Sequence, residues 1–279
     1  AGYWNYIQIG NSTYEGSAEF TNCEINYAES GIYVYNGTAT INNSEITEFY
    51  YRGVWVNSDG LVNLSNTNIY SGSYHSSYGH GIVTKTNSII NITNSTVTSC
   101  EWPIYYDGAG NITLNGENNF TGNTWDAVYV YHSSNSNYWT LPSIEIPYLF
   151  YNNSGYTVSE GGVLDIGSGN IIKVKNNEYF YVDGTLIAEA DVGENIYFTS
   201  ERDDELGGDT NNDGSSSSPD WGNWYGIKFR DSSNDASVMQ RCNIQYAGSS
   251  NYVGAVYLEN ASPTIDQCLF SNNYYGIIA

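Results

Sequence analysis

A phrase of 22 to 28 residues recurs along the first half of the chain, and this repetition limits the fold more than any other feature. Copies begin at Gly31, Gly53, Gly81 and Pro103, at spacings of 22, 28 and 22 residues. Each copy reads as three short alternating runs separated by turns rich in Asn, Gly and Ser. Three such strands cannot bury an apolar face alone, so successive copies must stack.

Stacking of these copies predicts an all-β fold, a right-handed parallel β-helix with three strands per coil and about 22–28 residues per coil. Parallel strands would then lie about 4.8 Å apart, and alternate residues would form ladders inside the coil. The residues predicted to face inward are Ile32, Val34, Ile41, Ile46, Val54, Val56, Val62, Leu64, Ile69, Ile82, Ile90, Ile92 and Val97. Those predicted at turns, where Asn tolerates a left-handed backbone, are Asn42, Asn43, Asn66, Asn91 and Asn94.

A longer repeat has a period of about 220 residues. GYWNYIQI at 2–9 matches GNWYGIKF at 222–229, and with small gaps residues 2–58 resemble 222–279. We therefore predict coils of one repeat unit over 1–143 and the start of the next β-helix unit over 144–279, in one continuous solenoid. Such a chain would be a segment of a tandem array or a subunit that meets its neighbours head to tail.

The transition between the predicted units contains the strands YTV, IIKVKN and IYFTS and the phrase VDGTLIAEA. Over about residues 147–230 this pattern resembles a family of bacterial and archaeal surface proteins, the parallel β-helix repeat proteins. The resemblance implies a surface or extracellular setting and a scaffolding or adhesive role, with no particular ligand. The chain departs from the family at VLDIGSGN, where a Pro-Gly turn is expected.

The charge of the chain excludes one class of partner. Thirty acidic residues against eight basic ones give a formal charge of −22, which would repel nucleic acid and anionic membranes. No apolar run is long enough to span a bilayer, so we expect no membrane insertion. A chain with few basic residues and abundant Asn, Ser, Thr, Tyr and Gly is typical of a secreted or cell-surface protein, whose export signal has been removed or lies outside the sequence. Ten Asn-x-Ser/Thr sequons are candidate glycosylation sites, although a chain rich in Asn, Ser and Thr also contains such sequons by chance. Their asparagines are Asn11, Asn36, Asn42, Asn63, Asn91, Asn94, Asn111, Asn119, Asn152 and Asn260.

An acidic insertion at about residues 201–221 carries the most specific local motif. Its spacing resembles the calcium loop of EF-hands, with oxygen ligands at alternate positions around a glycine. The predicted ligands of a structural calcium ion are the side chains of Asp209, Asn211, Asp213 and Asp220 and the carbonyl of Ser215. Nearby carboxylates, Glu201, Asp203, Asp204 and Glu205, would complete the site or be solvated. The alternative is a surface loop that binds no ion tightly.

Two cysteines lie about one coil apart. Cys242 and Cys268 are separated by 26 residues, which would place them on adjacent coils as a candidate disulfide. In the long repeat, however, Cys242 corresponds to Cys23 whereas Cys268 corresponds to Ser44, so the pair itself is not repeated.

These features favour an extracellular structural or adhesive β-helix that associates with itself. The alternative is a carbohydrate-binding or polysaccharide-cleaving β-helix, with aromatic rings at the turns stacking on sugars of a cell-surface or environmental polysaccharide. The aromatic candidates at turns and insertions are Tyr50, Tyr51, Tyr70, Tyr74, Tyr78, Tyr105, Tyr106, Trp139 and Tyr151. Catalysis is not expected, and no catalytic residue or organic cofactor is assigned. Gly79-His80-Gly81 and Asp203-Asp204 occur in the reverse of the order found in pectinase-like hydrolases, and the negative charge would repel uronate polymers.

Overall fold

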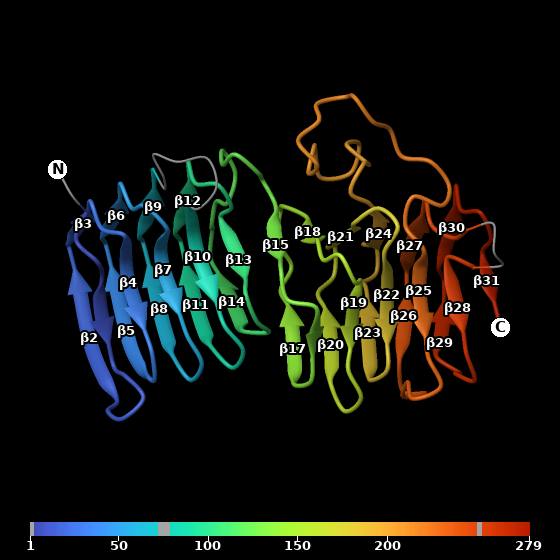
Figure 1. Cartoon of the computed structure of the whole chain (residues 1–279), viewed down its shortest axis with the longest axis horizontal. Helices are drawn as coiled ribbons and strands as arrows, with labels where there is room; N and C mark the ends of the chain where they lie inside the picture. Colours follow the sequence, from blue (N-terminus) through green and yellow to red (C-terminus); the bar gives the residue numbers. More distant parts are fainter. Residues whose placement is uncertain (1–2, 72–78, 250–252) are drawn as a thin grey trace. The chain divides into compact units, whose positions relative to one another are not determined.

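The fold consists of β-strands and turns. A computed structural model describes residues 3–71, 79–249 and 253–279, and no helix occurs in these ranges. By internal contacts the chain divides into two compact units, Ala1–Tyr129 and Val130–Ala279 (Figure 1). Strand β15 (Val128–Val130) contains the point of division. The predicted change of repeat unit at residues 143–144 stays a prediction.

The first unit is a stack of coils in which each turn of the chain contributes one strand to each of three sheets. All pairings are parallel. The first sheet contains β1 (Ile7–Ile9), β4 (Ser30–Val34), β7 (Arg52–Val56), β10 (His80–Thr84) and β13 (Ile104–Tyr106). The second contains β2 (Gly16–Thr21), β5 (Gly37–Asn42), β8 (Leu61–Ser65), β11 (Ile89–Thr93) and β14 (Asn111–Asn115). The third contains β3 (Glu24–Asn26), β6 (Glu45–Thr47), β9 (Asn68–Tyr70) and β12 (Thr96–Thr98).

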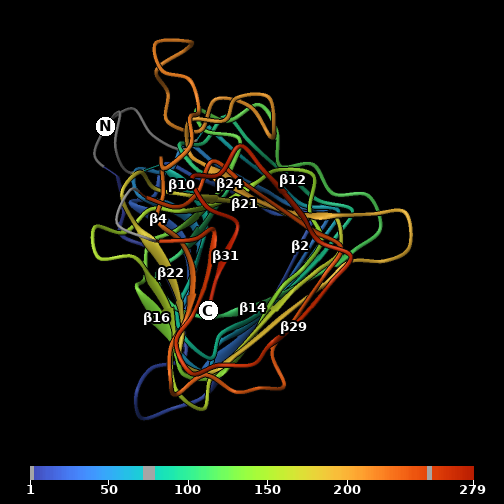
Figure 2. The same ribbon diagram turned by 90° about the vertical axis from the view of Figure 1, so that its right-hand side faces the viewer.

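The second unit repeats this three-walled arrangement, which Figure 2 shows along the coil axis through β21, β22 and β29. One wall contains β18 (Tyr148–Phe150), β21 (Ile171–Val174), β24 (Ile196–Ser200), β27 (Cys242–Gln245) and β30 (Leu269–Ser271). The next contains β16 (Ser134–Asn135), β19 (Tyr156–Val158), β22 (Tyr179–Val182), β25 (Gly226–Phe229), β28 (Val256–Leu258) and β31 (Ile277–Ile278). The last contains β17 (Tyr138–Leu141), β20 (Val163–Ile166), β23 (Thr185–Glu189), β26 (Val238–Gln240) and β29 (Thr264–Asp266).

Aliphatic ladders fill the interior of the coils, as predicted. Every residue predicted to face inward is buried, with at most 1% of its surface exposed. In the first sheet Ile32 aligns with Val54, and Val54 with Ile82, so like side chains stack from one turn to the next. Burying one such side chain contributes about 1.5–3 kcal/mol. The coils are therefore held together mainly by contacts that no single coil can make.

The corners of the coils use a left-handed residue, and Asn often provides it. The predicted turn residues Asn43, Asn66 and Asn94 have φ values of 49°, 48° and 48°. Placing Asn42 and Asn91 at turns was wrong, because these residues lie in β5 and β11. Each corner needs only one left-handed residue here, so the polar side chains on the strand before it simply face outward.

Outward asparagines still link neighbouring coils. The Nδ2 of Asn91 donates to the Oδ1 of Asn63, one coil earlier, over 2.8 Å. This is the copy-to-copy hydrogen bond of a solenoid ladder, formed on the face of a sheet rather than at a corner.

A small hydrogen-bonding residue follows each of several corners. The hydroxyl of Ser44 donates to the carbonyl of Asn42 over 2.8 Å and accepts the N–H of Cys23 over 3.1 Å. The hydroxyl of Thr67 and the thiols of Cys242 and Cys268 make the same type of bond to the carbonyl two residues before them. These cysteines thus occupy the structural position of Ser and Thr.

Candidate functional site

The acidic insertion joins β24 to β25 and forms the long loop that projects from the second unit (Figure 1). Lys173, from β21, lies fully buried beneath it. Its ammonium group donates to the carbonyl oxygens of Asp203 and Gly208, over 2.7 and 2.5 Å. Burial lowers the pKa of Lys173 to about 8, while the neighbouring Asp203, Asp204 and Asp209 oppose that shift. A buried cation therefore anchors the base of the loop.

Three carboxylates of the insertion converge. Asp204, Asp209 and Asp213 each have an oxygen atom within 4.8 Å of the others. The carboxylate of Asp209 also accepts the backbone N–H groups of Asp213 and Gly214, over 3.3 and 2.8 Å. The Oδ1 of Asp204 is buried and makes no hydrogen bond with the described residues. Calcium binds oxygen at 2.3–2.6 Å, so two of its ligands can stand up to about 5 Å apart. The three carboxylates fit such an ion.

The structure brings together only some of the predicted calcium ligands. Asp209 and Asp213 belong to the converging group, and the amide of Asn211 donates to the Oδ2 of Asp213 over 3.1 Å. Asp220 is engaged elsewhere, where its Oδ1 accepts the N–H of Trp221 over 2.8 Å. Ser215 is exposed, and its predicted contact through the backbone carbonyl stays a prediction.

The neighbouring acidic residues also differ in their surroundings. Asp204 joins the group, whereas the carboxylate of Asp203 accepts hydrogen bonds from Thr199 and Gln245. Glu201 accepts the N–H of Asn176.

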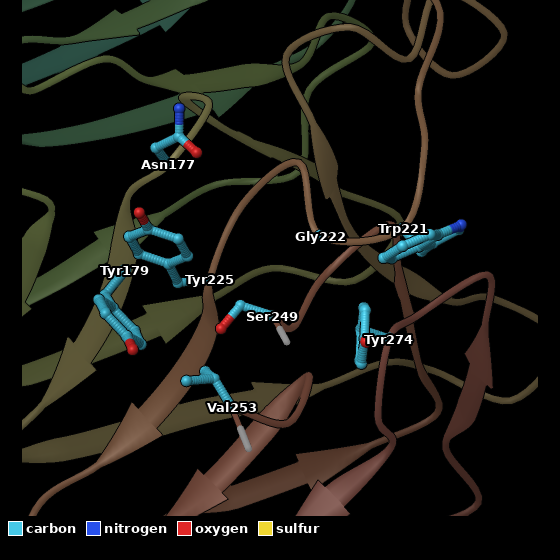
Figure 3. A pocket seen from close by; sticks show the side chains of 8 residues that line it. All are labelled: Asn177, Tyr179, Trp221, Gly222, Tyr225, Ser249, Val253 and Tyr274. Atoms are coloured by element: carbon cyan, nitrogen blue, oxygen red, sulfur yellow. The ribbon is translucent and has the colours of Figure 1, made fainter. Parts of the chain in front are cut away.

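Directly after the insertion, an aromatic groove of about 520 Å³ opens on the second unit (Figure 3). We define it by its lining residues, Asn177, Tyr179, Trp221, Gly222, Tyr225, Ser249, Val253 and Tyr274. Trp221 and Tyr274 lie on one side, with ring centroids 4.6 Å apart, and Tyr179 and Tyr225 lie on the other, 4.8 Å apart. None of the eight residues carries a formal charge.

Backbone hydrogen bonds between adjacent turns fix this groove. The N–H of Asn177 donates to the carbonyl of Asn223 over 2.7 Å, and that of Tyr225 donates to the carbonyl of Glu178 over 2.9 Å. On the far side the N–H of Tyr274 donates to the carbonyl of Ala247 over 2.8 Å. The groove is thus formed by the coil scaffold itself.

Sequence reasoning missed the aromatic groove. The aromatic candidates taken from the sequence include Trp139 and Tyr106, which are buried, and Tyr51 and Tyr151, which are each 36% exposed. Tyr74 and Tyr78 lie outside the described residues. The aromatic residues of the groove come from three separate segments of the chain, and only the stacking of coil turns brings them together.

His80, of the Gly-His-Gly phrase, lies in a packed polar cluster. Its Nδ1 lies 3.3 Å from the Oε2 of Glu101, and its ring stacks on Tyr105 with centroids 4.4 Å apart. Burial first, and Arg52 second, lower the pKa of His80 to about 3. Burial raises the pKa of Glu101. His80 is therefore neutral near pH 7 and serves as a packing residue.

The cysteines are thiols in the structure. Strands β27 and β30 pair with Asn243 opposite Leu269, so Cys242 and Cys268, one position earlier, face each other across adjacent coils. Their side chains are hydrogen-bonded, which lowers the pKa of Cys268 to about 7 and raises that of Cys242. The disulfide stays a prediction.

The sequon asparagines differ in exposure. Asn11, Asn94, Asn119 and Asn260 are exposed, while the remaining candidates are half-buried. Among the latter, Asn63 and Asn91 are hydrogen-bonded to each other on a sheet face.

Comparisons with known proteins bear on the fold. A family model described as a right-handed β-helix region matches residues 5–178. Searches of curated proteins and of solved structures each found no match. In the described part of the chain, no helix has the length and apolar character needed to cross a membrane. Because the family match covers more than half of the chain and both units are parallel three-walled coils, this protein belongs to the right-handed β-helix family.

Proposed function

We propose that this chain is an extracellular structural or adhesive β-helix, a segment of a tandem-repeat rod or a subunit of a head-to-tail filament. The observation that carries the proposal is the repeat of about 220 residues, because corresponding residues of its two copies make the same contacts. The indole N–H of Trp4 donates to the carbonyl of Asn26 over 2.9 Å, and that of Trp224 donates to the carbonyl of Gln245 over the same distance. Trp4 also pairs with Ala28 in a parallel bridge, as Trp224 does with Ala247.

The ladders make such a repeat suitable as a building block. Within each unit, a further turn buries its inward residues against the preceding turn and extends the parallel sheets. Stability therefore grows with the number of turns, and the same contacts would stiffen a tandem array. The charge of −22 would keep neighbouring arrays apart in solution.

The proposed role includes one structural calcium ion in the insertion. The convergence of Asp204, Asp209 and Asp213 supports it, because three carboxylates this close repel one another without a cation. Glycans at the exposed sequons would be compatible with an exported rod.

Negative-stain electron microscopy of the native protein, with and without a calcium chelator, tests the proposal. The expected result is rods or filaments with a regular axial repeat that lose order when calcium is removed. Isolated short particles that do not respond to the chelator would contradict it.

The second candidate, carbohydrate binding, is favoured by the aromatic groove. An uncharged groove with aromatic walls and hydroxyl and amide groups is typical of small-molecule or sugar sites. An adhesive rod would use such a groove to hold its target.

A further inference from the structure

The aromatic groove has two parts that share a ridge. Trp221 and Tyr274 line the 520 Å³ groove, and together with Asn273 they also border a shallower depression of about 340 Å³. The two rings meet edge to face, with an interplanar angle of 61°. A ligand that fills both depressions must therefore be extended and pass over this ridge.

Charge is absent from the groove and balanced on the adjoining sheet. On β25 and the residue after it, Lys228 lies 3.2 Å from Glu259, and Arg230 pairs with Asp183. The basic side chains of this sheet are thus paired with carboxylates, and the chain as a whole carries a charge of −22. An uronate or other anion would find no unpaired cation among the lining residues and would be repelled by the rest of the chain.

The groove offers two kinds of contact. Tyr179, Tyr225, Trp221 and Tyr274 present aromatic rings. Ser249 supplies a polar group between the two aromatic sides, and Asn177 supplies another on the side of Tyr179 and Tyr225 (Figure 3). Sugar rings have apolar C–H faces and hydroxyl edges, and these match aromatic faces and amide or hydroxyl groups. Trp221 is 55% exposed, so its side chain is accessible to a ligand in the groove.

Trp221 is held ready for this contact. The backbone N–H of Trp221 donates to the Oδ1 of Asp220 over 2.8 Å. The backbone N–H of Asp220 donates to the Oδ1 of Asn223, also over 2.8 Å. Gly222, with a φ of 81°, makes the turn that follows. The ring therefore projects from a fixed turn, so binding orders little backbone.

From these observations we propose that the aromatic groove binds a segment of an uncharged polysaccharide. Trp221 and Tyr274 form the central stacking platform, and Tyr179 and Tyr225 contact the neighbouring sugar. The inference rests on the proposed adhesive function and specifies its target.

Isothermal titration calorimetry with neutral gluco-, manno- and galacto-oligosaccharides tests the proposal, with oligogalacturonate as the charged probe. At least one neutral series should bind, and oligogalacturonate should bind at least tenfold more weakly. Trp221→Ala and Tyr274→Ala should each lower the affinity about tenfold, which corresponds to about 1.4 kcal/mol. Tyr14→Ala, which removes a 70% exposed ring from the first unit, is the matched control and should leave the affinity unchanged.

Several outcomes would overturn the inference. These are no binding of any neutral series, equal binding of oligogalacturonate, or wild-type affinity in both groove variants. Concentration-dependent self-association that is lost in Trp221→Ala, without sugar binding, would instead assign the groove to a second copy of the chain.

Two further readouts separate this inference from the proposed function. Circular dichroism should show native β-structure in both variants, because Trp221 is largely exposed and Tyr274 is only half-buried. Rods seen by electron microscopy should persist in Trp221→Ala even when sugar binding is lost.

Discussion

At the scale of single residues, a small hydrogen-bonding side chain that follows several of the left-handed corners links one coil to the next. Thr67 is fully buried, and its hydroxyl lies 3.2 Å from the carbonyl of Ile41 and 3.0 Å from that of Ser65. Its N–H in turn donates to the hydroxyl of Ser95 over 3.1 Å. Hydroxyl and thiol groups both suit this position, which explains why Cys23 and Ser44 are neighbours in the same ladder.

Thr67→Val removes the hydroxyl without changing the volume of the side chain. We expect a loss of about 1–3 kcal/mol in the free energy of unfolding, because buried carbonyls lose their donor. Urea denaturation of the variant and of Thr21→Val, whose hydroxyl is exposed, measures the difference. Equal denaturation midpoints for the two variants would show that the ladder bond contributes nothing.

The thiol pair yields a prediction about oxidation. Treated with a low-molecular-weight disulfide such as oxidised glutathione, Cys242 and Cys268 should form one disulfide, with two molecules of reduced glutathione released. The pKa of Cys268, lowered to about 7, makes it the attacking thiolate, so the rate should rise as the pH passes through about 7. Intact-mass measurement should show the loss of two hydrogen atoms.

Cysteine-to-serine variants identify the sulfur atoms involved. Cys268→Ser should abolish the mass change, and Cys100→Ser should not. A mixed disulfide with glutathione that never closes would show that the two thiols cannot reach bonding geometry.

At the scale of elements, the insertion depends on Lys173. Lys173→Met keeps the length of the side chain but removes the donor to the carbonyls of Asp203 and Gly208. The loop should then be cut faster at residues 201–221 in limited proteolysis. Lys175→Met, which removes an ammonium group lying over the ring of Tyr151, is the control and should leave the rate unchanged. The same cleavage rate in both variants would contradict the anchoring role.

The pH dependence of stability should also change in Lys173→Met. Because the folded-state pKa of Lys173 is about 8 and the ordinary value is 10.5, the unfolded chain binds the proton more tightly. The contribution of Lys173 to stability should therefore increase as the pH rises from about 8 to 10.5. Denaturation curves of the wild type and the variant, compared across this range, isolate that contribution. A difference that does not vary with pH would contradict it.

Calcium should bind to the same loop. Asp209→Asn retains an oxygen that can accept the backbone bonds from Asp213 and Gly214, but it removes one negative charge from the converging group. We expect calcium to raise the melting temperature of the wild type, by an amount equivalent to about 2.7 kcal/mol at a hundredfold excess over Kd, and to have much less effect on the variant. The exposed Asp231→Asn is the control. An identical response of all three proteins would rule out an ion at this site.

At the scale of the whole molecule, the sequence predicted the coils far better than the groove. Ladder positions such as Ile32, Val54 and Ile82 follow from a period of two within strands and a repeat between them, and both are visible in one dimension. The calcium motif predicted Asp209 and Asp213 for the same reason, since they are local. Asp204, which sequence reasoning named only as a neighbouring carboxylate, lies beside them because the path of a long loop is set by tertiary contacts, here with Lys173. The role of Asp220 as a ligand stays a prediction.

The aromatic groove could not be predicted in this way. Tyr179 and Tyr274 are separated by several turns of chain, and their approach depends on insertion lengths that no short motif reveals. The long repeat, by contrast, was visible because Trp4 and Trp224 must each make the same indole contact.

Immunogold electron microscopy of the cells that produce the protein tests the central claim most directly. An extracellular tandem β-helix predicts label on the outer surface or on shed material, along projections with a regular axial repeat. Label confined to the cell interior would contradict the account.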